Sequence, residues 1–468
     1  MSDFQLLING QLEAGDATMD VINPATGESF AQAPRASKAQ LDKAVAAAKA
    51  AFPGWAATPI ADRKAALTAC ADAIQANLQE LARLLTQEQG KPIGDAMGEV
   101  FGASAFFRYF TTLDLPMEVI EDSPTKLVEA YRKPLGVVGA IVPWNFPLIL
   151  MAFKVPAALL AGNTMVLKPA PTTPLATLRL AAIIKDCLPP GVLNVISDAG
   201  DLGAAMTAHP DIRKISFTGS SETGKKVMAG AADALKRITL ELGGNDAGIV
   251  LGDNDPKTVA PALFASAFQN SGQVCIAMKR VYVHSSIYDA VCAELAELAK
   301  AAVVGDGLEQ GTKIGPLQNK AQYDKVLGFI ESARIDGNII AGGDTPDRAG
   351  YFINPTIVRD ITDGSKLVDE EQFGPVLPVI RFEDPLDAVT RANNGPYGLG
   401  GSIWSKDLDL AKSLAMQMDT GTVWINKHAD LAPNVPFGGA KMSGLGTELG
   451  QHGLEEFTQL AVINMARG

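Results

Sequence analysis

One stretch of the chain constrains the fold more than any other. Between residues 137 and 241, short runs rich in β-branched residues alternate with segments of helical pattern. The runs that we expect to be strands are Val137–Val142, Thr164–Leu167, Asn194–Ile196, Lys214–Phe217 and Arg237–Leu240. Strands separated by helices form a parallel sheet with helices on its faces. Ligands of such sheets bind beyond the carboxyl ends of the strands, so the residues that follow each strand are candidates for chemistry.

A second alternating region runs from about residue 246 to 426. The strands expected in it are Ala247–Leu251, Val281–His284, Phe352–Val358, Gly400–Trp404 and Gly421–Ile425. Two α/β domains of similar size are the simplest interpretation. Ahead of both regions, helical patterns extend to about residue 112. Ser37 and Gln40 fit a helix capping box, and Pro53 is expected to end the helix that follows.

The composition excludes several classes of protein. The chain has 468 residues, of which 47% are hydrophobic and 20% charged, and its net charge is −12. This balance is typical of a globular protein and argues against a nucleic-acid binder, whose surface would be basic. The polar N-terminus and the lack of any run of ~20 apolar residues predict neither a signal peptide nor a membrane helix. We therefore expect a cytoplasmic protein without a membrane partner.

The cysteines and histidines limit the chemistry further. Cys70, Cys187, Cys275 and Cys292 are widely spaced, and no Cys-x-x-Cys or His-Glu-x-x-His pattern occurs, so we expect no metal site. Before Cys275, the sequence Ser271-Gly272-Gln273 interrupts a helical pattern, which would place the thiol on a turn. A buried core thiol is the commoner role of a free cysteine. A thiol beside a base or a helix end is instead a nucleophile.

Two polar residues directly follow predicted strands. Glu241 precedes a Leu-Gly-Gly sequence. In apolar surroundings its pKa would be raised, which suits a general base, but a solvated acid at a strand end is an equally open interpretation. Asn145 lies in the loop Pro143–Pro147, where its amide could donate to an oxyanion. A turn-forming role is the commoner one for Asn beside Pro.

Two further positions suit an anionic ligand. Gly219 and Ser220 lie between a predicted strand and a predicted helix, where free backbone N–H groups bind phosphate. Their spacing matches neither the GxGxxG nor the P-loop pattern, so this signal is weak by itself. Lys168 ends another predicted strand, where a cation could hold a ribose or phosphate oxygen.

Together and in this order, these segments resemble the NAD(P)-dependent aldehyde dehydrogenase superfamily. The matching motifs are PWNFP (143–147), KPA (168–170), FTGS (217–220), ELGG (241–244), GQVC (272–275), EEQFGPV (370–376), GTVWIN (421–426) and PFGG (436–439). The resemblance covers nearly the whole chain, and eight motifs in family order are very specific. It implies an α/β fold with a Rossmann-like cofactor domain, a second α/β catalytic domain and a small β oligomerisation element.

The resemblance also implies a role for each matching residue. Cys275 would be the nucleophile and Glu241 the base that activates the deacylating water. Asn145 and the Cys275 backbone N–H would form the oxyanion hole, and Lys154 would relay protons. The residues expected to contact NAD, or NADP, are Trp144, Lys168, Gly219, Ser220, Glu371 and Phe373. The implied reaction converts an aldehyde to a carboxylic acid through a cysteine thiohemiacetal and thioester.

Two positions depart from the family pattern. Many NAD-preferring relatives have Glu three residues after the lysine at position 168, and this chain has Pro171 there. Proline neither accepts a bond from the ribose 2′-hydroxyl nor repels a 2′-phosphate, so NAD is expected with NADP possible. In some relatives a glutamate of the C-terminal tail pairs with the lysine at position 154. The corresponding position in this chain is expected to be Gln459, so a proton relay through a charged residue there is in doubt.

The family's fold also implies domain limits. The cofactor domain would comprise residues 1–117 and 136–245, and the catalytic domain residues 246–447. The oligomerisation element would comprise residues 118–135 and 448–468. Its apolar run Leu460–Met465 would be an exposed edge strand in a monomer, so we expect a homodimer or homotetramer.

Other functions remain open at this point. A CoA-acylating dehydrogenase would use the same thioester, but Glu241 favours hydrolysis. A non-catalytic binding or structural protein on this fold is disfavoured by the intact catalytic motifs, and a cysteine hydrolase lacks a histidine in a recognisable triad context. Residues expected around the substrate are apolar, namely Phe146, Leu150, Phe153, Val274 and Ile276. They predict a hydrophobic aliphatic or aromatic aldehyde.

Overall fold

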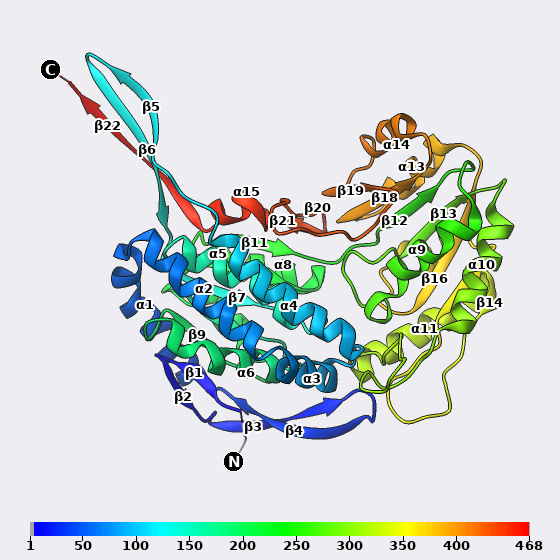
Figure 1. Cartoon of the computed structure of the whole chain (residues 1–468), viewed down its shortest axis with the longest axis horizontal. Coiled ribbons are helices and arrows are strands. Elements are labelled where there is room, and N and C mark those ends of the chain that lie inside the picture. Colours follow the sequence, from blue (N-terminus) through cyan, green and yellow to red (C-terminus); the bar gives the residue numbers. More distant parts are fainter. Residues whose placement is uncertain (1–3, 468) are drawn as a thin grey trace.

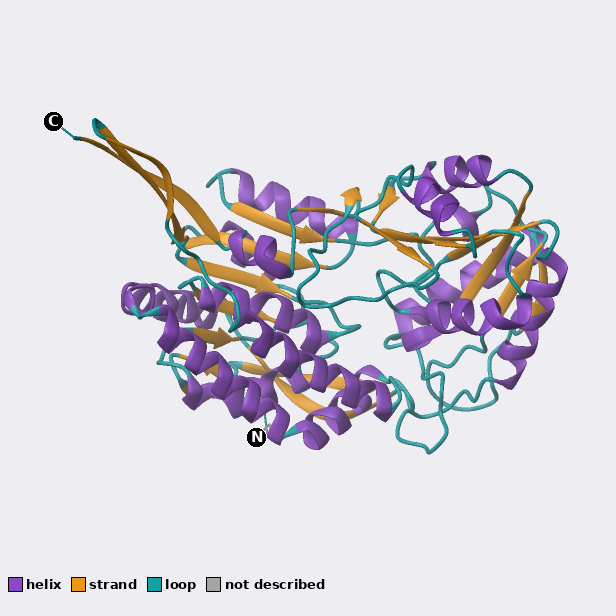
Figure 2. Cartoon of the chain, turned by 45° about the horizontal axis from the view of Figure 1, so that its top comes forward, coloured by secondary structure: helices purple, strands orange, loops and turns teal. Residues whose placement is uncertain are grey.

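A computed structural model describes residues 4–467 (Figure 1). Its first sheet has the strand order β2-β1-β9-β8-β7-β10-β11-β21. The parallel strands at its centre are β7 (Val137–Ile141), β8 (Thr164–Lys168), β9 (Leu193–Val195), β10 (Ile212–Thr218) and β11 (Arg237–Glu241). All five match the strands predicted from the sequence. Helices cover both faces of the sheet (Figure 2), and β7 and β8 are accordingly buried at every residue.

The order of these strands marks where a ligand can bind. From β7 the chain moves outward to β8 and β9, then returns to the other side of β7 for β10 and β11. The crevice at such a reversal, beyond the carboxyl ends of the strands, is the binding position in doubly wound sheets. Asn145, Lys168, Gly219 and Glu241 all lie at this edge.

Helices cover both faces of this sheet. Those that connect its strands are α5 (Pro147–Leu160), α6 (Leu175–Ile184), α7 (Gly203–Ala208) and α8 (Ser221–Ala232). The N-terminal helices are α1 (Lys38–Ala57), α2 (Ile60–Ala76), α3 (Leu78–Gln89) and α4 (Ile93–Phe110), of which α2, α3 and α4 pack on α5 and α6. Two antiparallel pairs lie at the rim, β1 (Leu6–Ile8) with β2 (Gln11–Glu13) and β3 (Ala17–Asn23) with β4 (Glu28–Arg35).

The first helix differs from its prediction at one end. The capping box of Ser37 and Gln40 is present, but α1 continues past Pro53 to Ala57. Pro53 is exposed, and two residues later the buried Trp55 donates from Nε1 to the Leu159 carbonyl at 3.0 Å. This anchor holds the last turn to α5 and outweighs the hydrogen bond that a proline removes.

The second sheet has the order β14-β15-β16-β13-β12-β18-β19. Its strands are β12 (Ala247–Val250), β13 (Arg280–His284), β14 (Asn338–Ala341), β15 (Thr356–Arg359), β16 (Val376–Phe382), β18 (Gly400–Trp404) and β19 (Thr422–Ile425). The helices around it are α9 (Pro256–Phe268), α10 (Tyr288–Ala301), α11 (Lys320–Asp336), α12 (Lys366–Asp369), α13 (Pro385–Asn393) and α14 (Leu408–Ala415). The parallel strand β16 was not among the predicted strands.

A narrow three-stranded sheet projects from the body of the molecule, and we call it the arm (Figure 1). It consists of β5 (Glu118–Ser123), β6 (Lys126–Pro134) and β22 (Thr458–Ala466), with β6 in the middle. The remaining short elements are β17 (Tyr397–Gly398), β20 (Ala440–Lys441), β21 (Gly444–Leu445) and α15 (Gly450–Glu455). Within residues 4–467, no helix has the length and apolar character needed to cross a membrane.

Candidate active site

The chain reaches Cys275 through a strained turn. After α9, Asn270, Ser271 and Gly272 have φ values of 48°, 57° and 74°. Two consecutive non-glycine residues in the left-handed region are costly, and such strain gathers at functional sites. Gly272 is required sterically as well, because a Cβ there would lie 2.3 Å from the Gly374 carbonyl oxygen. The turn confirms the helix break predicted just before the thiol.

Asn145 joins the loop after β7 to this turn. Its Nδ2 donates to the Gln273 carbonyl at 3.0 Å, and its own carbonyl accepts from Asn270 Nδ2 at 3.1 Å. The buried Lys91 also donates to that carbonyl, at 2.9 Å. An amide nitrogen carries two hydrogens, so the second hydrogen of Asn145 stays available to a group bound beside Cys275.

The surroundings of Cys275 favour the protonated thiol. Cys275 keeps some exposure through the cavities described below, yet burial raises the pKa of its thiol to about 12. The ammonium of Lys279 opposes this increase, and its Nζ donates to the carbonyls of Val274 and Cys275 at 2.7 Å each. The thiol therefore needs a proton acceptor before it can act as a thiolate.

Glu241 is a buried carboxyl without a hydrogen-bond partner. It ends β11 and is 4% exposed, and neither carboxylate oxygen has a partner among the described residues. Burial raises its pKa well above the usual value, the charge of Glu448 raises it further, and Lys154 lowers it. The backbone of Glu241 pairs with Gly444 of β21, which fixes the end of the strand. An unpartnered carboxyl with a raised pKa suits proton transfer.

Lys154 has a different partner from the one expected. Its Nζ forms a buried ion pair with Glu448, with side-chain exposures of 0% and 2%. Ser216 Oγ also donates to Glu448, at 3.3 Å. Gln459, which was predicted at this place, is exposed on β22 and pairs with Lys133 of the arm. That prediction was wrong: Glu448 lies eleven residues before Gln459, where the chain still passes beside α5.

Cys275 lies where two cavities meet. One cavity, of about 190 Å³, is lined by Glu241, Glu448 and mostly apolar side chains. The other, of about 180 Å³, is lined by Trp144, Gly219, Ser220, Glu371 and Phe373. Asn145 and Cys275 line both cavities. A molecule in either cavity would therefore have access to the thiol and to the free hydrogen of the Asn145 amide.

The second cavity fits the nicotinamide half of a dinucleotide. Ser220 caps α8, whose first turn offers free N–H groups to a pyrophosphate. Gly219 is needed there, because a Cβ would lie 2.5 Å from the ring of Phe217. Across the cavity, Glu371 accepts from the Gly244 backbone at 3.1 Å and leaves its second oxygen for a ribose hydroxyl. The rings of Trp144 and Phe373 meet edge to face at 5.5 Å.

The predicted apolar residues all line the first cavity, namely Phe146, Leu150, Phe153, Val274 and Ile276. No sequence pattern pointed to the other residues that line it, among them Phe106, Gln269, Ala429, Leu431 and Phe437. Phe437 belongs to the PFGG motif, which was a usable signal. Phe106 lies in α4, and only the packing of α4 on α5 brings it to Phe153, with ring centroids 4.6 Å apart.

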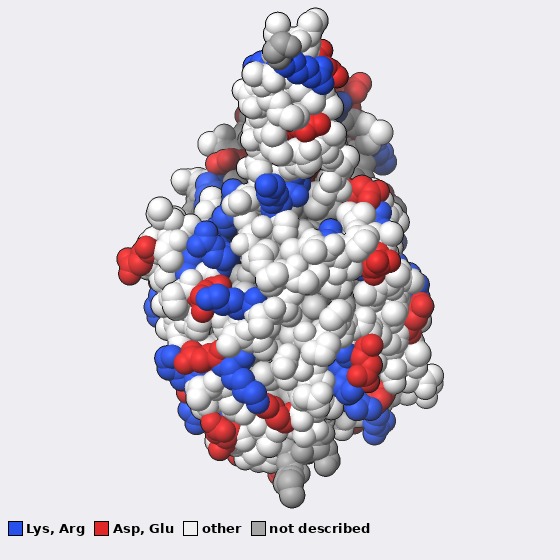
Figure 3. Space-filling model, turned by 90° about the vertical axis from the view of Figure 1, so that its left-hand side faces the viewer, with Lys and Arg blue, Asp and Glu red and all other residues white. Residues whose placement is uncertain are grey.

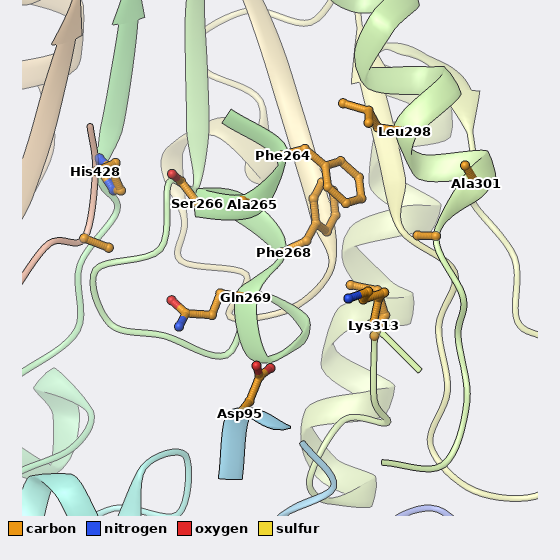
Figure 4. A pocket seen from close by; sticks show the side chains of 13 residues that line it. Asp95, Phe264, Ala265, Ser266, Phe268, Gln269, Leu298, Ala301, Lys313 and His428 are labelled. Atoms are coloured by element: carbon orange, nitrogen blue, oxygen red, sulfur yellow. The ribbon is translucent and has the colours of Figure 1, made fainter. Parts of the chain in front are cut away.

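A larger cavity, of about 610 Å³, lies beside α9 and shares Gln269 and Ala429 with the first cavity (Figure 4). The rings of Phe264 and Phe268 lie on its wall, with centroids 4.5 Å apart and planes tilted by 32°. Its histidine, His428, donates or accepts at Ser402 Oγ and the Ile276 carbonyl, and burial lowers its pKa to about 3. Neither Cys275 nor Glu241 lines this cavity, so the reactive groups face the two smaller ones.

Comparison with known proteins agrees with this geometry. A family model described as the aldehyde dehydrogenase family matches residues 12–463. The chain is 41% identical to a phenylacetaldehyde dehydrogenase from Pseudomonas fluorescens, over 97% of this chain and 94% of that protein. The chain belongs to the aldehyde dehydrogenase family. As a member, it is an NAD(P)-dependent oxidoreductase that converts an aldehyde to a carboxylic acid.

Solved structures of aldehyde dehydrogenases superpose closely on this chain. The NAD+ complex of the Bacillus cereus enzyme has a TM-score of 0.97 and 37% identity, covering 99% of this chain and 96% of that one. An NADP-dependent enzyme from E. coli also has a TM-score of 0.97, with 35% identity, covering 99% and 98%. Overall similarity therefore does not decide between the two dinucleotides, and the residues around the ribose must be considered.

Proposed function

We propose that this aldehyde dehydrogenase oxidises hydrophobic, ring-bearing aldehydes with NAD, using Cys275 as the nucleophile and Glu241 as the base. The observation that carries the proposal is the position of Cys275 at the junction of two cavities. Glu241 lies in the wall of one, and the candidate cofactor residues line the other. The substrate carbonyl and the hydride acceptor can then approach the same sulfur from opposite sides.

The residues divide the reaction as follows. Cys275, once deprotonated, adds to the aldehyde carbonyl, and the oxyanion accepts from Asn145 and the Cys275 backbone N–H. When bound, NAD supplies the acceptor for the hydride that leaves the thiohemiacetal. Glu241 then takes a proton from water, which attacks the thioester and releases the acid. The Lys154–Glu448 pair lies behind Glu241 and gives its proton a path away from the site.

The first cavity supports a ring-bearing substrate. Four of its lining side chains are phenylalanines, Phe106, Phe146, Phe153 and Phe437, and none of the described residues that line it is a cation. Aromatic walls favour a flat apolar group and offer no counter-charge to an acidic semialdehyde. Its volume of about 190 Å³ accommodates a small substrate. The relative from Pseudomonas fluorescens, named for phenylacetaldehyde, agrees with this class.

The arm supports a homo-oligomer. Its strand β22 exposes Leu460, Val462, Ile463 and Met465. The adjoining face has few charged residues at its centre (Figure 3). We therefore assign residues 118–135 and 448–468 to assembly, residues 1–117 and 136–245 to the cofactor domain, and residues 246–447 to the catalytic domain. All four cysteines are free, which agrees with a cytoplasmic location.

The proposal is tested with Cys275→Ala. The variant should lose aldehyde oxidation, because a methyl group cannot form the thioester, and should still bind NAD in calorimetry. Wild type should produce NADH from phenylacetaldehyde without CoA. A strict requirement for CoA would assign the acylating reaction instead. Absence of NADH formation across an aldehyde panel would favour a non-catalytic protein, and an active Cys275→Ala variant would refute the nucleophile.

A further inference from the structure

The group expected to bind the adenosine ribose is already paired in this protein. Lys168 ends β8 and Asp198 follows β9, and these strands are neighbours in the sheet. Lys168 Nζ lies 2.7 Å from Asp198 Oδ1, and the exposures of the two side chains are 6% and 0%. The second oxygen, Oδ2, accepts from the Leu202 backbone at 2.7 Å. The carboxylate is thereby fixed from both sides.

The position of this pair relates it to the cofactor. In doubly wound sheets, the residue at the end of the second strand meets the adenosine ribose, and an acidic group there favours a free 2′-hydroxyl. Here β7 is the first strand of the unit and β8 the second, so Lys168 occupies that place. Pro171 follows on the same loop, and Gly200 faces it: a Cβ on Gly200 would lie 3.7 Å from Pro171 Cγ.

The other cations around this edge are paired too. Arg35 contacts Asp201 at 2.8 Å, and Lys320, which lines a hollow beside Pro171 and Ala199, contacts Asp324 at 2.5 Å. A 2′-phosphate carries about −1.5 to −2 charges and needs a free guanidinium or ammonium. Arg35, Lys168 and Lys320 thus each have a carboxylate partner.

We propose that Asp198 makes this enzyme select NAD over NADP by neutralising and fixing Lys168. Besides Asp198, Lys168 Nζ donates to the Pro169 carbonyl at 3.4 Å, so the ammonium keeps one donor for a ribose hydroxyl. The carboxylate of Asp198 offsets the positive charge that would otherwise attract a 2′-phosphate. Asp198, in the loop after β9, thus disfavours the 2′-phosphate of NADP, whereas Pro171, in the loop after β8, has no charge with which to do so. This inference rests on the proposed function, because it assumes that a dinucleotide occupies this edge.

The test measures binding by calorimetry, with NAD, NADP, 5′-AMP and adenosine 2′,5′-bisphosphate as probes. Wild type should bind NAD more tightly than NADP by about tenfold or more. In Asp198→Asn this ratio should fall by about fivefold or more, mainly through tighter NADP binding, because Lys168 becomes free to pair with phosphate. The fragment pair should show the same change, which locates it at the adenosine end.

Two further variants complete the design. Asp211→Asn removes a carboxylate paired with Lys49 elsewhere on the same domain and should leave the ratio unchanged. Asp198→Asn combined with Pro171→Glu should regain the preference for NAD, because a carboxylate returns from the other loop. Regained preference would also show that the combined variant is folded.

The outcomes separate the two proposals. Equal wild-type affinities for NAD and NADP would overturn the role of Asp198, even if Asp198→Asn failed to fold. An unchanged ratio in a folded Asp198→Asn variant would overturn it as well. If wild type bound neither dinucleotide, the proposed function itself would fail.

Discussion

Glu241 has the environment of a proton acceptor with no competing bond. Its carboxyl oxygens have no partner among the described residues, and burial, together with Glu448, raises its pKa. At low pH the carboxyl is protonated and cannot take a proton from water. The base form appears only as the pH rises through the raised pKa, so thioester hydrolysis should accelerate with pH in a range above the usual value for Glu.

Glu241→Gln should separate the two halves of the reaction. Cys275 can still be acylated, so about one NADH per active site should appear as a burst. The following turnover should fall by about 10²–10⁴-fold, because general-base catalysis is lost. Rapid-mixing absorbance measures both phases, and mass spectrometry should find the acyl group on the peptide with Cys275. Hydroxylamine, which attacks the thioester directly, should restore turnover.

The control for the burst is Cys275→Ala, which should show none. If Glu241→Gln showed neither burst nor adduct, Glu241 would also be needed to deprotonate Cys275. The pKa of about 12 for that thiol makes this second role a physical alternative that the experiment decides.

The sequence singled out Cys275, Glu241 and Asn145, which the fold brings to one cavity, but not the partner of Lys154. These three residues lie two or three positions from a glycine or proline, which marks them within the chain. Glu448 has no such local sign of a bond to Lys154, because the two residues are 294 positions apart. The counter-ion of Lys168 was missed for the same reason: Asp198 meets it only through the pairing of β8 with β9.

At the scale of elements, α3 and α6 are joined by one buried and one exposed acidic residue. Glu88, at the end of α3, accepts from the backbone of Leu175 and Ala176 at 2.7 and 2.9 Å. Glu80, in the first turn of α3, forms a solvent-exposed ion pair with Arg179 of α6 at 2.6 Å. The two residues link the same helices, so their comparison isolates the effect of burial.

Burial raises the pKa of Glu88 to about 8, although the two backbone donors oppose the increase. Because the folded state holds this proton more tightly than the unfolded chain, whose Glu pKa is about 4.3, the contribution of Glu88 to stability falls as pH rises between these values. Glu88→Gln should therefore flatten the dependence of the unfolding free energy on pH. Urea unfolding between about pH 5 and 8 measures the slope. Glu80→Gln should retain the wild-type slope, and an equal slope in both variants would contradict the assignment.

Local patterns predicted most elements and failed where tertiary contacts dominate. All strands of the first sheet's parallel core were found, since each is a short apolar run between helices. β16 was missed because Pro378 interrupts its pattern, although Pro378 lies in register with Val358 of β15. The extension of α1 beyond Pro53 was missed because Trp55 is fixed by a carbonyl of α5 that no local pattern reveals.

For the whole molecule, the arm is the feature that a single copy leaves uncovered. Leu460 and Val462 are 58% and 53% exposed and lie on the same face of β22. Leu460→Asp with Val462→Asp should convert the proposed oligomer to monomers, because the charges could not be buried in an interface. Sedimentation velocity measures the change. Asn464→Gln changes a side chain on the same face without adding a charge and should leave assembly intact. A wild type that is monomeric at all concentrations would refute the role of the arm.

The strand β21 has a consequence for the order in which the protein matures. Gly444 of β21 pairs with Glu241 of the adjacent strand β11, and Glu448 follows four residues later as the counter-ion of Lys154. During synthesis, Cys275 and Glu241 therefore leave the ribosome long before the segment that orders them. A nascent or truncated chain that ends before residue 444 carries its thiol without the completed proton pathway. The candidate active site is therefore complete only after the chain has been synthesised as far as Glu448.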